Sequence, residues 1–227
     1  CPYPANQGRV WRARSAENVI GEIEHLQNTY GIQEVSILDD MFTTDPKRVE
    51  KICSLIIEKK LKISWTCPNG IRVDSINRDL LQLMKKAGCY QLAFGIESGN
   101  QEVLNKIRKQ IDLVQARKAI EWCRELGIET ISFFMIGLPY DNPKTMQDTI
   151  DFAKSLKTDF VQFTNTVPYP GTELFDLVQK HGRFLITDWE KYGSYTGRAY
   201  YELYDLKGQD VEEFYRRANR AIYMRPG

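Results

Sequence analysis

Polar, acidic and glycine-bearing segments follow several apolar runs of this chain. They are Asp39-Asp40, Pro68-Asn69-Gly70, Glu97-Ser98-Gly99, Gly137-Leu138-Pro139 and Pro170-Gly171-Thr172. A glycine lets the backbone approach a ligand closely, and a carboxylate such as Glu97 can accept hydrogen bonds from both hydroxyls of a ribose. The carboxylates of Asp39 and Asp40 could hold an ammonium group or a metal. These residue types indicate a nucleotide site, although Asp and Gly also serve as ordinary caps and turns.

The elements that must position these segments alternate along the chain. Apolar residues recur at helical spacing from Ser15 onward, and Gly31 is expected to end the first helix. The expected strands cover residues 35–38, 63–66, 91–94, 131–136 and 160–164, with Pro68-Asn69-Gly70 ending the second. Apolar strands joined by helices indicate a parallel sheet, either open or closed toward a barrel. Ligands bind at the carboxyl ends of such strands, where the polar segments lie.

Composition narrows the class of protein. The chain has 227 residues, of which 42% are hydrophobic and 27% charged, and its net charge is +1. This balance is typical of a soluble globular protein, with no electrostatic sign of a nucleic-acid partner. No apolar run approaches the roughly 18 residues of a membrane span. Because the chain begins with Cys1 rather than Met, we expect its natural N-terminus to lie upstream.

Cysteine and histidine usage bears on compartment and metal. Five cysteines at irregular spacing make a poor disulfide framework, so a reducing, cytoplasmic location is expected. Cys53, Cys89 and Cys123 fit packed thiols, whereas Cys67 follows a strand and could fill space or touch a ligand. Two histidines argue against a histidine-based zinc site.

The character of the chain changes after Gly182. Seven of the twelve tyrosines fall between Tyr192 and Tyr223, and the last apolar stripe is that of an amphipathic helix. We expect a core of residues 1–181 and a C-terminal extension, residues 182–227, packed on it. The tyrosines could line a substrate channel or meet a lipid-like substrate, or they could simply pack with their hydroxyls in water.

An ordered set of segments resembles one enzyme superfamily. The segments are Cys1-Pro2-Tyr3-Pro4, residues 8–15, Leu38-Asp39-Asp40-Met41-Phe42-Thr43, Phe94-Gly95-Ile96-Glu97-Ser98-Gly99, Met135-Ile136-Gly137-Leu138-Pro139 and Tyr169-Pro170-Gly171-Thr172. They resemble, in order, the motifs of radical S-adenosylmethionine (radical SAM) enzymes, most like the core domain of the cobalamin-binding group. The resemblance covers residues 1–181.

The resemblance implies a fold and a chemistry. The fold would be α/β: a partial (β/α)6 TIM-like barrel of parallel strands with a C-terminal helical extension, its first strand lying before Cys1. Three cysteines would hold a 4Fe-4S cluster that binds S-adenosylmethionine. One electron would cleave this cofactor to a 5′-deoxyadenosyl radical, which abstracts hydrogen from an unactivated carbon.

The same resemblance implies site residues and partners. Cofactor contacts would come from Asp39, Asp40, Asn69, Glu97, Ser98, Gly99, Ile136, Gly137 and Leu138, and one cluster ligand would be Cys1. The family also places a basic residue near Lys109. Partners would be a small-molecule or lipid-like substrate and a reductant such as a flavodoxin or ferredoxin. Cobalamin would bind through a domain outside this chain.

The cluster motif departs from the family pattern. The second and third cysteines are expected where Ala5 and Gly8 stand, and one thiolate does not hold a cluster. Either residues are absent between Pro4 and Ala5, or the motif has been lost. At the rim, Arg72 could clamp a carboxylate, although a solvated side chain is the ordinary interpretation.

Three functions compete. The first is a radical SAM enzyme that methylates, cyclises or rearranges a carbon skeleton in natural-product, lipid or cofactor biosynthesis. The second is a cobalamin-independent radical SAM enzyme acting on RNA or a small metabolite. The third is a cluster-free barrel that binds a nucleotide-like ligand or a protein partner without catalysis.

Overall fold

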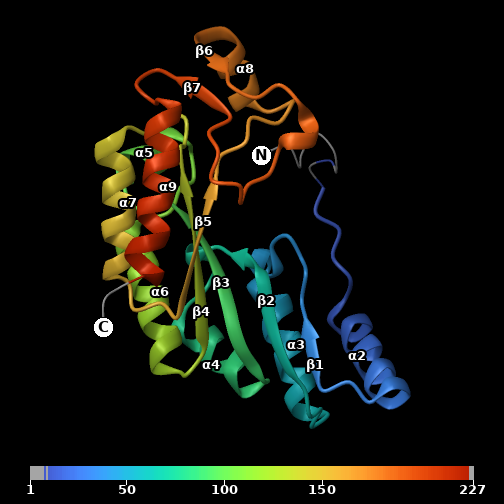
Figure 1. Ribbon diagram of the computed structural model, residues 1–227. Coiled ribbons are helices and arrows are strands. Elements are labelled where there is room, and N and C mark those ends of the chain that lie inside the picture. The colour runs from blue at the N-terminus through green and yellow to red at the C-terminus, as the bar shows by residue number, and fades with distance from the viewer. Residues whose placement is uncertain (1–7, 9, 225–227) are drawn as a thin grey trace.

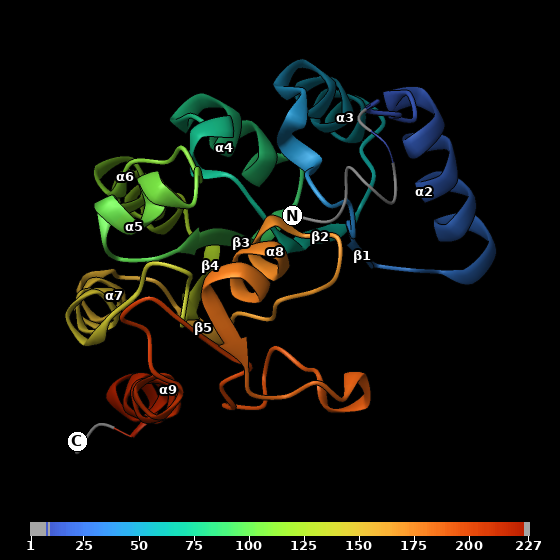
Figure 2. The same cartoon turned by 90° about the horizontal axis from the view of Figure 1, so that it is seen from above.

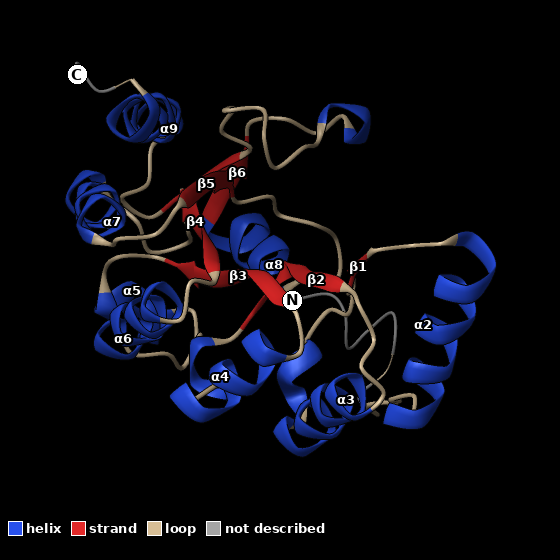
Figure 3. Ribbon diagram, turned by 90° about the horizontal axis from the view of Figure 1, so that it is seen from below, coloured by secondary structure: helices blue, strands red, loops and turns tan. Residues whose placement is uncertain are grey.

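The sheet at the centre of the molecule is entirely parallel. The computed structural model describes residues 8 and 10–224, and the strands of the central sheet within them pair in chain order, β1-β2-β3-β4-β5. The strands are β1 (Glu34–Ser36), β2 (Ser64–Ile71), β3 (Cys89–Glu97), β4 (Glu129–Ile136) and β5 (Phe160–Asn165). Seen end-on, the sheet curls into an arc with helices along its outer side (Figures 2 and 3). This architecture confirms the predicted α/β partial barrel.

Helices cover the convex side of the arc. Helix α2 (Ala16–Tyr30) precedes β1, and the helices that join successive strands are α3 (Pro46–Glu58), α4 (Arg78–Lys86), α5 (Gln101–Lys106), α6 (Leu113–Glu125) and α7 (Pro143–Ser155), with short 3-10 turns η1 (Phe42–Thr44) and η2 (Val73–Ser75). The predicted limits of the first helix are confirmed, because Ser15 caps α2 through the N–H of Asn18, and Gly31 ends it at φ 67°.

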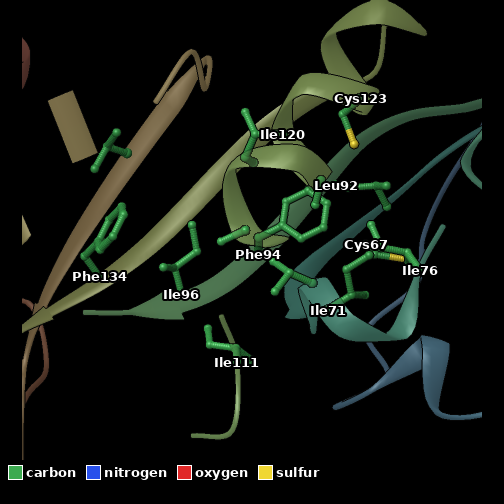
Figure 4. Close-up of a cluster of buried hydrophobic side chains, with 14 of the residues drawn as sticks. Cys67, Ile71, Ile76, Leu92, Phe94, Ile96, Ile111, Ile120, Cys123 and Phe134 are labelled. Atoms are coloured by element: carbon green, nitrogen blue, oxygen red, sulfur yellow. The ribbon is translucent and has the colours of Figure 1, made fainter. Parts of the chain in front are cut away.

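The core lies between the strands and these helices. Leu92 and Phe94 lie beside Ile120 of α6 (Figure 4), and the ring of Phe134 meets that of Phe152 of α7 edge-on at 6.3 Å. Burying each such side chain contributes about 1.5–3 kcal/mol to folding. Because side chains alternate across a strand, Phe133 and Met135 point to the opposite, concave face, where they are half-buried.

The predicted end of the second strand is wrong. Strand β2 does not stop at Pro68-Asn69-Gly70 but continues to Ile71, which pairs with Phe94 of β3 after a register shift beyond Cys67. Gly70 has a φ of 92°, which only glycine adopts at little cost. This irregularity absorbs the residues that would otherwise end the strand.

The C-terminal part crosses the carboxyl end of the sheet and returns along its side (Figure 1). Its elements are α8 (Glu173–His181), β6 (Gly182–Phe184), η3 (Trp189–Lys191), β7 (Tyr201–Leu203) and α9 (Gly208–Tyr223). Strands β6 and β7 form an antiparallel pair, and α9 packs against α7 and β5. The predicted boundary after residue 181 falls between α8 and β6, and the division into a core and a C-terminal extension stays a prediction.

The same segment supplies hydrogen-bond partners for backbone N–H groups at the outer edge of β5. The N–H of Val161 donates to the hydroxyl of Tyr223 at 3.3 Å, and the N–H of Asn165 donates to the carbonyl of Ser194 at 2.7 Å. Residues 182–224 therefore serve that edge in place of a sixth strand. In residues 8 and 10–224, no helix has both the length and the apolar character needed to cross a membrane.

Two glycine-to-alanine substitutions test this packing. In Gly88→Ala, the new Cβ would lie 2.2 Å from the carbonyl oxygen of Ile63 at a φ of 95°. We expect a loss of about 2 kcal/mol or more in the free energy of unfolding. In the control Gly21→Ala, within α2, the Cβ meets nothing within 4 Å, and we expect a gain of about 0.5–1 kcal/mol. Urea unfolding measures both, and equal effects would contradict the described packing.

Candidate functional site

The loops that follow the parallel strands meet at one edge of the sheet. Asp39 and Asp40 follow β1, Asn69 lies near the end of β2, and Glu97 is the last residue of β3. The Nδ2 group of Asn69 donates to the carbonyl of Leu38 at 2.8 Å, which ties the ends of β1 and β2 together. The predicted segments therefore share the edge at which parallel α/β folds bind ligands.

Among these strand-end residues, Glu97 has an unusual backbone conformation. Its φ is 72°, a left-handed conformation that costs a non-glycine residue about 1–2 kcal/mol. The pairing of β3 with β4 shifts between Gly95 and Glu97, and this irregularity turns the side chain back along its own strand. A Cβ added to Gly95 would lie 3.0 Å from Oε1 of Glu97. The carboxylate therefore lies over Gly95, where a side chain would obstruct it.

The carboxylate of Glu97 is held by a cation. Nζ of Lys109 donates to Oε1 of Glu97 at 2.8 Å, and each side chain is about one quarter exposed, 22% and 23%. Among the described residues, Oε2 of Glu97 has no protein hydrogen-bond partner. One carboxylate oxygen is therefore fixed by protein, and the other is available to hydroxyl donors of a ligand.

A second buried carboxylate organises the end of β4. Oδ2 of Asp141 accepts hydrogen bonds from the N–H groups of Gly137 and Leu138 at 3.2 and 2.8 Å, and the hydroxyl of Thr145 donates to Oδ1 at 2.7 Å. Burial raises the pKa of Asp141 to about 6, against the opposing effect of these hydrogen bonds. Through these hydrogen bonds, Asp141 holds the backbone of the Gly137–Leu138 turn in place.

The C-terminal part braces the same turn. The hydroxyl of Tyr201 donates to the carbonyl of Gly137 at 2.7 Å. Gly137 has a φ of 84°, and a Cβ there would lie 3.0 Å from both methyl groups of Val211 in α9. The predicted cofactor-contact turn is therefore built jointly by β4, α7, β7 and α9.

Several predicted site residues are packed inside the protein, among them Ser98, Gly99 and Ile136. Ser98 is fully buried, and its hydroxyl lies 3.2 Å from that of Thr149 in α7. A Cβ on Gly99 would lie 2.5 Å from Cβ of Phe152. Ile136 is fully buried and shares the helix-covered face of β4 with Phe134. Cofactor contact through these residues stays a prediction, and their visible role is to hold the turns against α7.

Asp39 and Asp40 lie apart from Glu97, along the β1 side. They line a groove of about 910 Å³ between β1 and α2. Oδ2 of Asp39 lies 3.8 Å from Nη1 of Arg48. Their predicted contact with an amino group stays a prediction, and the structure gives Asp39 a cation of its own.

The described cysteines do not form a cluster site. Burial raises the pKa of Cys53 and Cys123 to about 12 and also raises the pKa of Cys67 and Cys89 well above the ordinary value of a thiol. Such buried thiols are inert packing groups, which confirms the interpretation of Cys53, Cys89 and Cys123. In the described part of the chain, no three His, Cys, Asp or Glu side chains gather as a metal site. The predicted ligand Cys1 lies outside the described residues, so its role as a cluster ligand stays a prediction.

Two residues of this site are not among those that the sequence predicts. Met135, not Ile136, lies on the concave face of β4, where it is half-buried, and the period-two alternation of strand side chains could have shown this. The other is the buried Asp141, which bonds to the Gly137–Leu138 turn. Arg72, for which both a carboxylate clamp and a solvated side chain were expected, pairs with the carboxylate of Asp74 and donates to two loop carbonyls.

Comparisons with known proteins agree with this geometry. A family model described as the radical SAM superfamily matches residues 1–153. An uncharacterized methyltransferase from Pyrococcus horikoshii is 34% identical over 226 residues, covering 100% of this chain and 48% of that protein. Cytidylyl-2-hydroxyethylphosphonate methyltransferase from Streptomyces wedmorensis is 32% identical over 174 residues, covering 74% of this chain and 32% of that protein. The chain spans half or less of the length of these relatives.

A solved structure shares the fold. It is the radical S-adenosylmethionine methyltransferase TsrM from Kitasatospora setae, with cobalamin and a 4Fe-4S cluster bound. The match has a TM-score of 0.65 at 18% identity and covers 74% of this chain and 34% of that chain. Likeness at this identity concerns the fold alone.

Asp141 makes the stability of the protein depend on pH. Its pKa of about 6 in the folded protein lies above the ordinary value of 3.8. The stability it contributes is therefore present below pH 3.8 and is lost as the pH rises through 6. In Asp141→Asn this loss is absent. We expect the free energy of unfolding of the variant, relative to the parent, to rise by on the order of 3 kcal/mol between pH 3.5 and 7.5. A pH-independent difference in urea unfolding would contradict the burial assigned to Asp141.

Proposed function

We propose a function for this chain from one premise: the chain belongs to the radical SAM superfamily and is an enzyme of that superfamily. Its proposed activity is radical-based methyl transfer to an unactivated carbon of a small-molecule or lipid-like substrate. The names of the two relatives support methyl transfer. Ring formation or rearrangement in a biosynthetic route is the alternative within the same chemistry.

The observation that carries the proposal is the placement of Glu97. A ribose presents two adjacent hydroxyl donors, and an ionised carboxylate is an acceptor with about four lone-pair positions. Lys109 occupies Oε1 and leaves Oε2 open among the described residues. The strained backbone and the bare Gly95 beneath the carboxylate support a site shaped for a ligand, since strain of this kind concentrates at functional sites.

The neighbouring turn suits the base of the same ligand. Met135 and Phe133 offer half-buried apolar surface on the concave face beside Glu97, and Glu97 pairs in register with Phe134, three residues before Gly137. Apolar side chains with nearby backbone polar groups are what a flat nucleobase requires. We therefore assign the ribose of S-adenosylmethionine to Glu97 and its adenine to the concave face before Gly137.

The superfamily's cofactors complete the proposal. A 4Fe-4S cluster supplies the electron for cleavage of S-adenosylmethionine in this superfamily, and the described residues of this chain contribute binding and exclusion of water. Cobalamin, bound to the structural neighbour TsrM, would belong to a part of the protein outside this chain. A flavodoxin or ferredoxin is the proposed reductant.

The cluster is tested with the protein made from its complete gene and reconstituted anaerobically with iron and sulfide. Electron paramagnetic resonance and absorbance spectra are recorded with reductant, before and after S-adenosylmethionine is added. A cluster signal that changes on addition, with formation of 5′-deoxyadenosine, supports the proposal. A folded protein that takes up no iron and forms no 5′-deoxyadenosine would leave only a nucleotide-binding scaffold.

The ribose assignment predicts a loss of affinity in Glu97→Gln. A hydrogen bond to a charged group contributes about 1.5–3 kcal/mol, so we expect S-adenosylhomocysteine to bind about ten- to a hundredfold more weakly by calorimetry. Glu102→Gln is the control, because Glu102 is exposed on α5 and forms an ion pair with Lys106 one helical turn away. Equal affinity in parent and Glu97→Gln would remove Glu97 from the site.

A further inference from the structure

The loop that presents Lys109 has an unfavourable backbone. It joins α5 to α6, and the residues on either side of Lys109 are both left-handed, with φ of 58° at Arg108 and 54° at Gln110. Neither is a glycine, and each such residue costs about 1–2 kcal/mol. A loop of this shape persists only when surrounding groups hold it.

Arg72 is one of the groups that hold this loop. Nη1 of Arg72 donates to the carbonyl of Lys109, and Nη2 donates to the carbonyl of Gln110, both at 3.1 Å. These carbonyls belong to two successive residues of the loop. The arginine lies 37 residues before Lys109 in the sequence, just after β2. It therefore fastens the strained loop to the end of a different strand.

Asp74 orients the guanidinium. Nε and Nη2 of Arg72 donate to the two carboxylate oxygens of Asp74 at 2.8 and 2.5 Å, and both side chains are about one third exposed. This pairing raises the pKa of Arg72 and lowers the pKa of Asp74. Because a guanidinium is planar, fixing one edge on Asp74 directs the remaining N–H groups at the loop. A lysine offers no such fork.

The series of contacts that begins at Arg72 ends at the carboxylate of Glu97, which is proposed to bind ribose. The loop aims Nζ of Lys109 at Oε1 of Glu97, 2.8 Å away. A second ion pair of the loop, Arg108 with Glu173 of α8, is about two thirds exposed at both partners and contributes little to holding the loop. Because Arg72 bonds to the carbonyl of Lys109 itself and to that of the next residue, the path from Arg72 through the loop to Glu97 can fix the carboxylate.

We propose that Arg72, oriented by Asp74, is a positioning residue for nucleoside binding, acting through Lys109 to fix the carboxylate of Glu97. This inference rests on the proposed function, because it takes Glu97 as the ribose acceptor. Without Arg72 the loop relaxes, Lys109 leaves Oε1, and a ligand must order both side chains when it binds. Arg72 touches neither ligand nor cluster in this account.

A double-mutant cycle tests the route of action. The complete protein and its variants Arg72→Lys, Lys109→Met and Arg72→Lys/Lys109→Met are titrated with S-adenosylhomocysteine by calorimetry. We expect each single variant to bind about tenfold more weakly and the double variant to match Lys109→Met. Arg78→Lys is the control for the chemical change, since Arg78 makes an exposed pair with Glu125. Affinity losses that multiply in the double variant, or unchanged affinity in Arg72→Lys, would overturn the proposal.

Hydrogen exchange of the ligand-free proteins gives a second, independent measurement. The N–H of Lys109 donates to the carbonyl of Leu104 at 2.9 Å. We expect faster exchange in residues 107–111 for Arg72→Lys but not for Lys109→Met, because only the first variant releases the loop. Equal exchange in parent and Arg72→Lys would overturn the positioning role. If the loop responds as expected while Glu97→Gln binds as the parent does, the proposed ribose site fails and the fastening of the loop by Arg72 stands.

Discussion

Every strand of the central sheet runs in the same direction, and this single constraint decides where ligand-binding residues can lie. Parallel pairing in chain order brings the carboxyl ends of β1 to β5 to one edge and sends each connection back across the convex face as a helix. The convex face thereby becomes the core, filled by Phe94, Phe134 and their neighbours. The concave face keeps partly exposed side chains such as Phe133 and Met135. Binding surface and stabilising surface are two sides of the same strands.

The order and type of the elements could be predicted from the sequence, because a fully covered parallel strand must be apolar and its helix must show a matching stripe. Ser15 and Gly31 delimit α2 for local reasons that a sequence displays. The length of β2 could not be predicted, since whether Gly70 ends a strand or deforms it depends on the pairing of Ile71 with Phe94. Helix caps can be predicted from neighbouring residues, whereas the register of a strand depends on pairing partners far along the chain.

The candidate site divides in the same way. Glu97 and Gly137 could be singled out because acidic and glycine residues after an apolar strand are conspicuous. The contacts that hold them could not be predicted, because the partners are distant in the sequence: Lys109 lies 12 residues from Glu97, Arg72 lies 37 residues before Lys109, and Tyr201 lies 64 residues after Gly137. The direction of the side chains was not predicted either. Ser98 and Ile136 stand in the predicted segments but turn toward α7 and the core, as strand alternation and the packing of the turn require.

A curled sheet that does not close has two free edges, and free edges invite strand addition from other molecules. At β5 the donors of Val161 and Asn165 are already engaged by Tyr223 and Ser194, so a second chain finds no continuous row of N–H groups there. Among the described residues, the opposite edge of the sheet is β1, which is three residues long and carries Glu34, so it is a poor template for a foreign strand. By engaging these donors, the C-terminal part also disfavours pairing of β5 with a strand of another molecule.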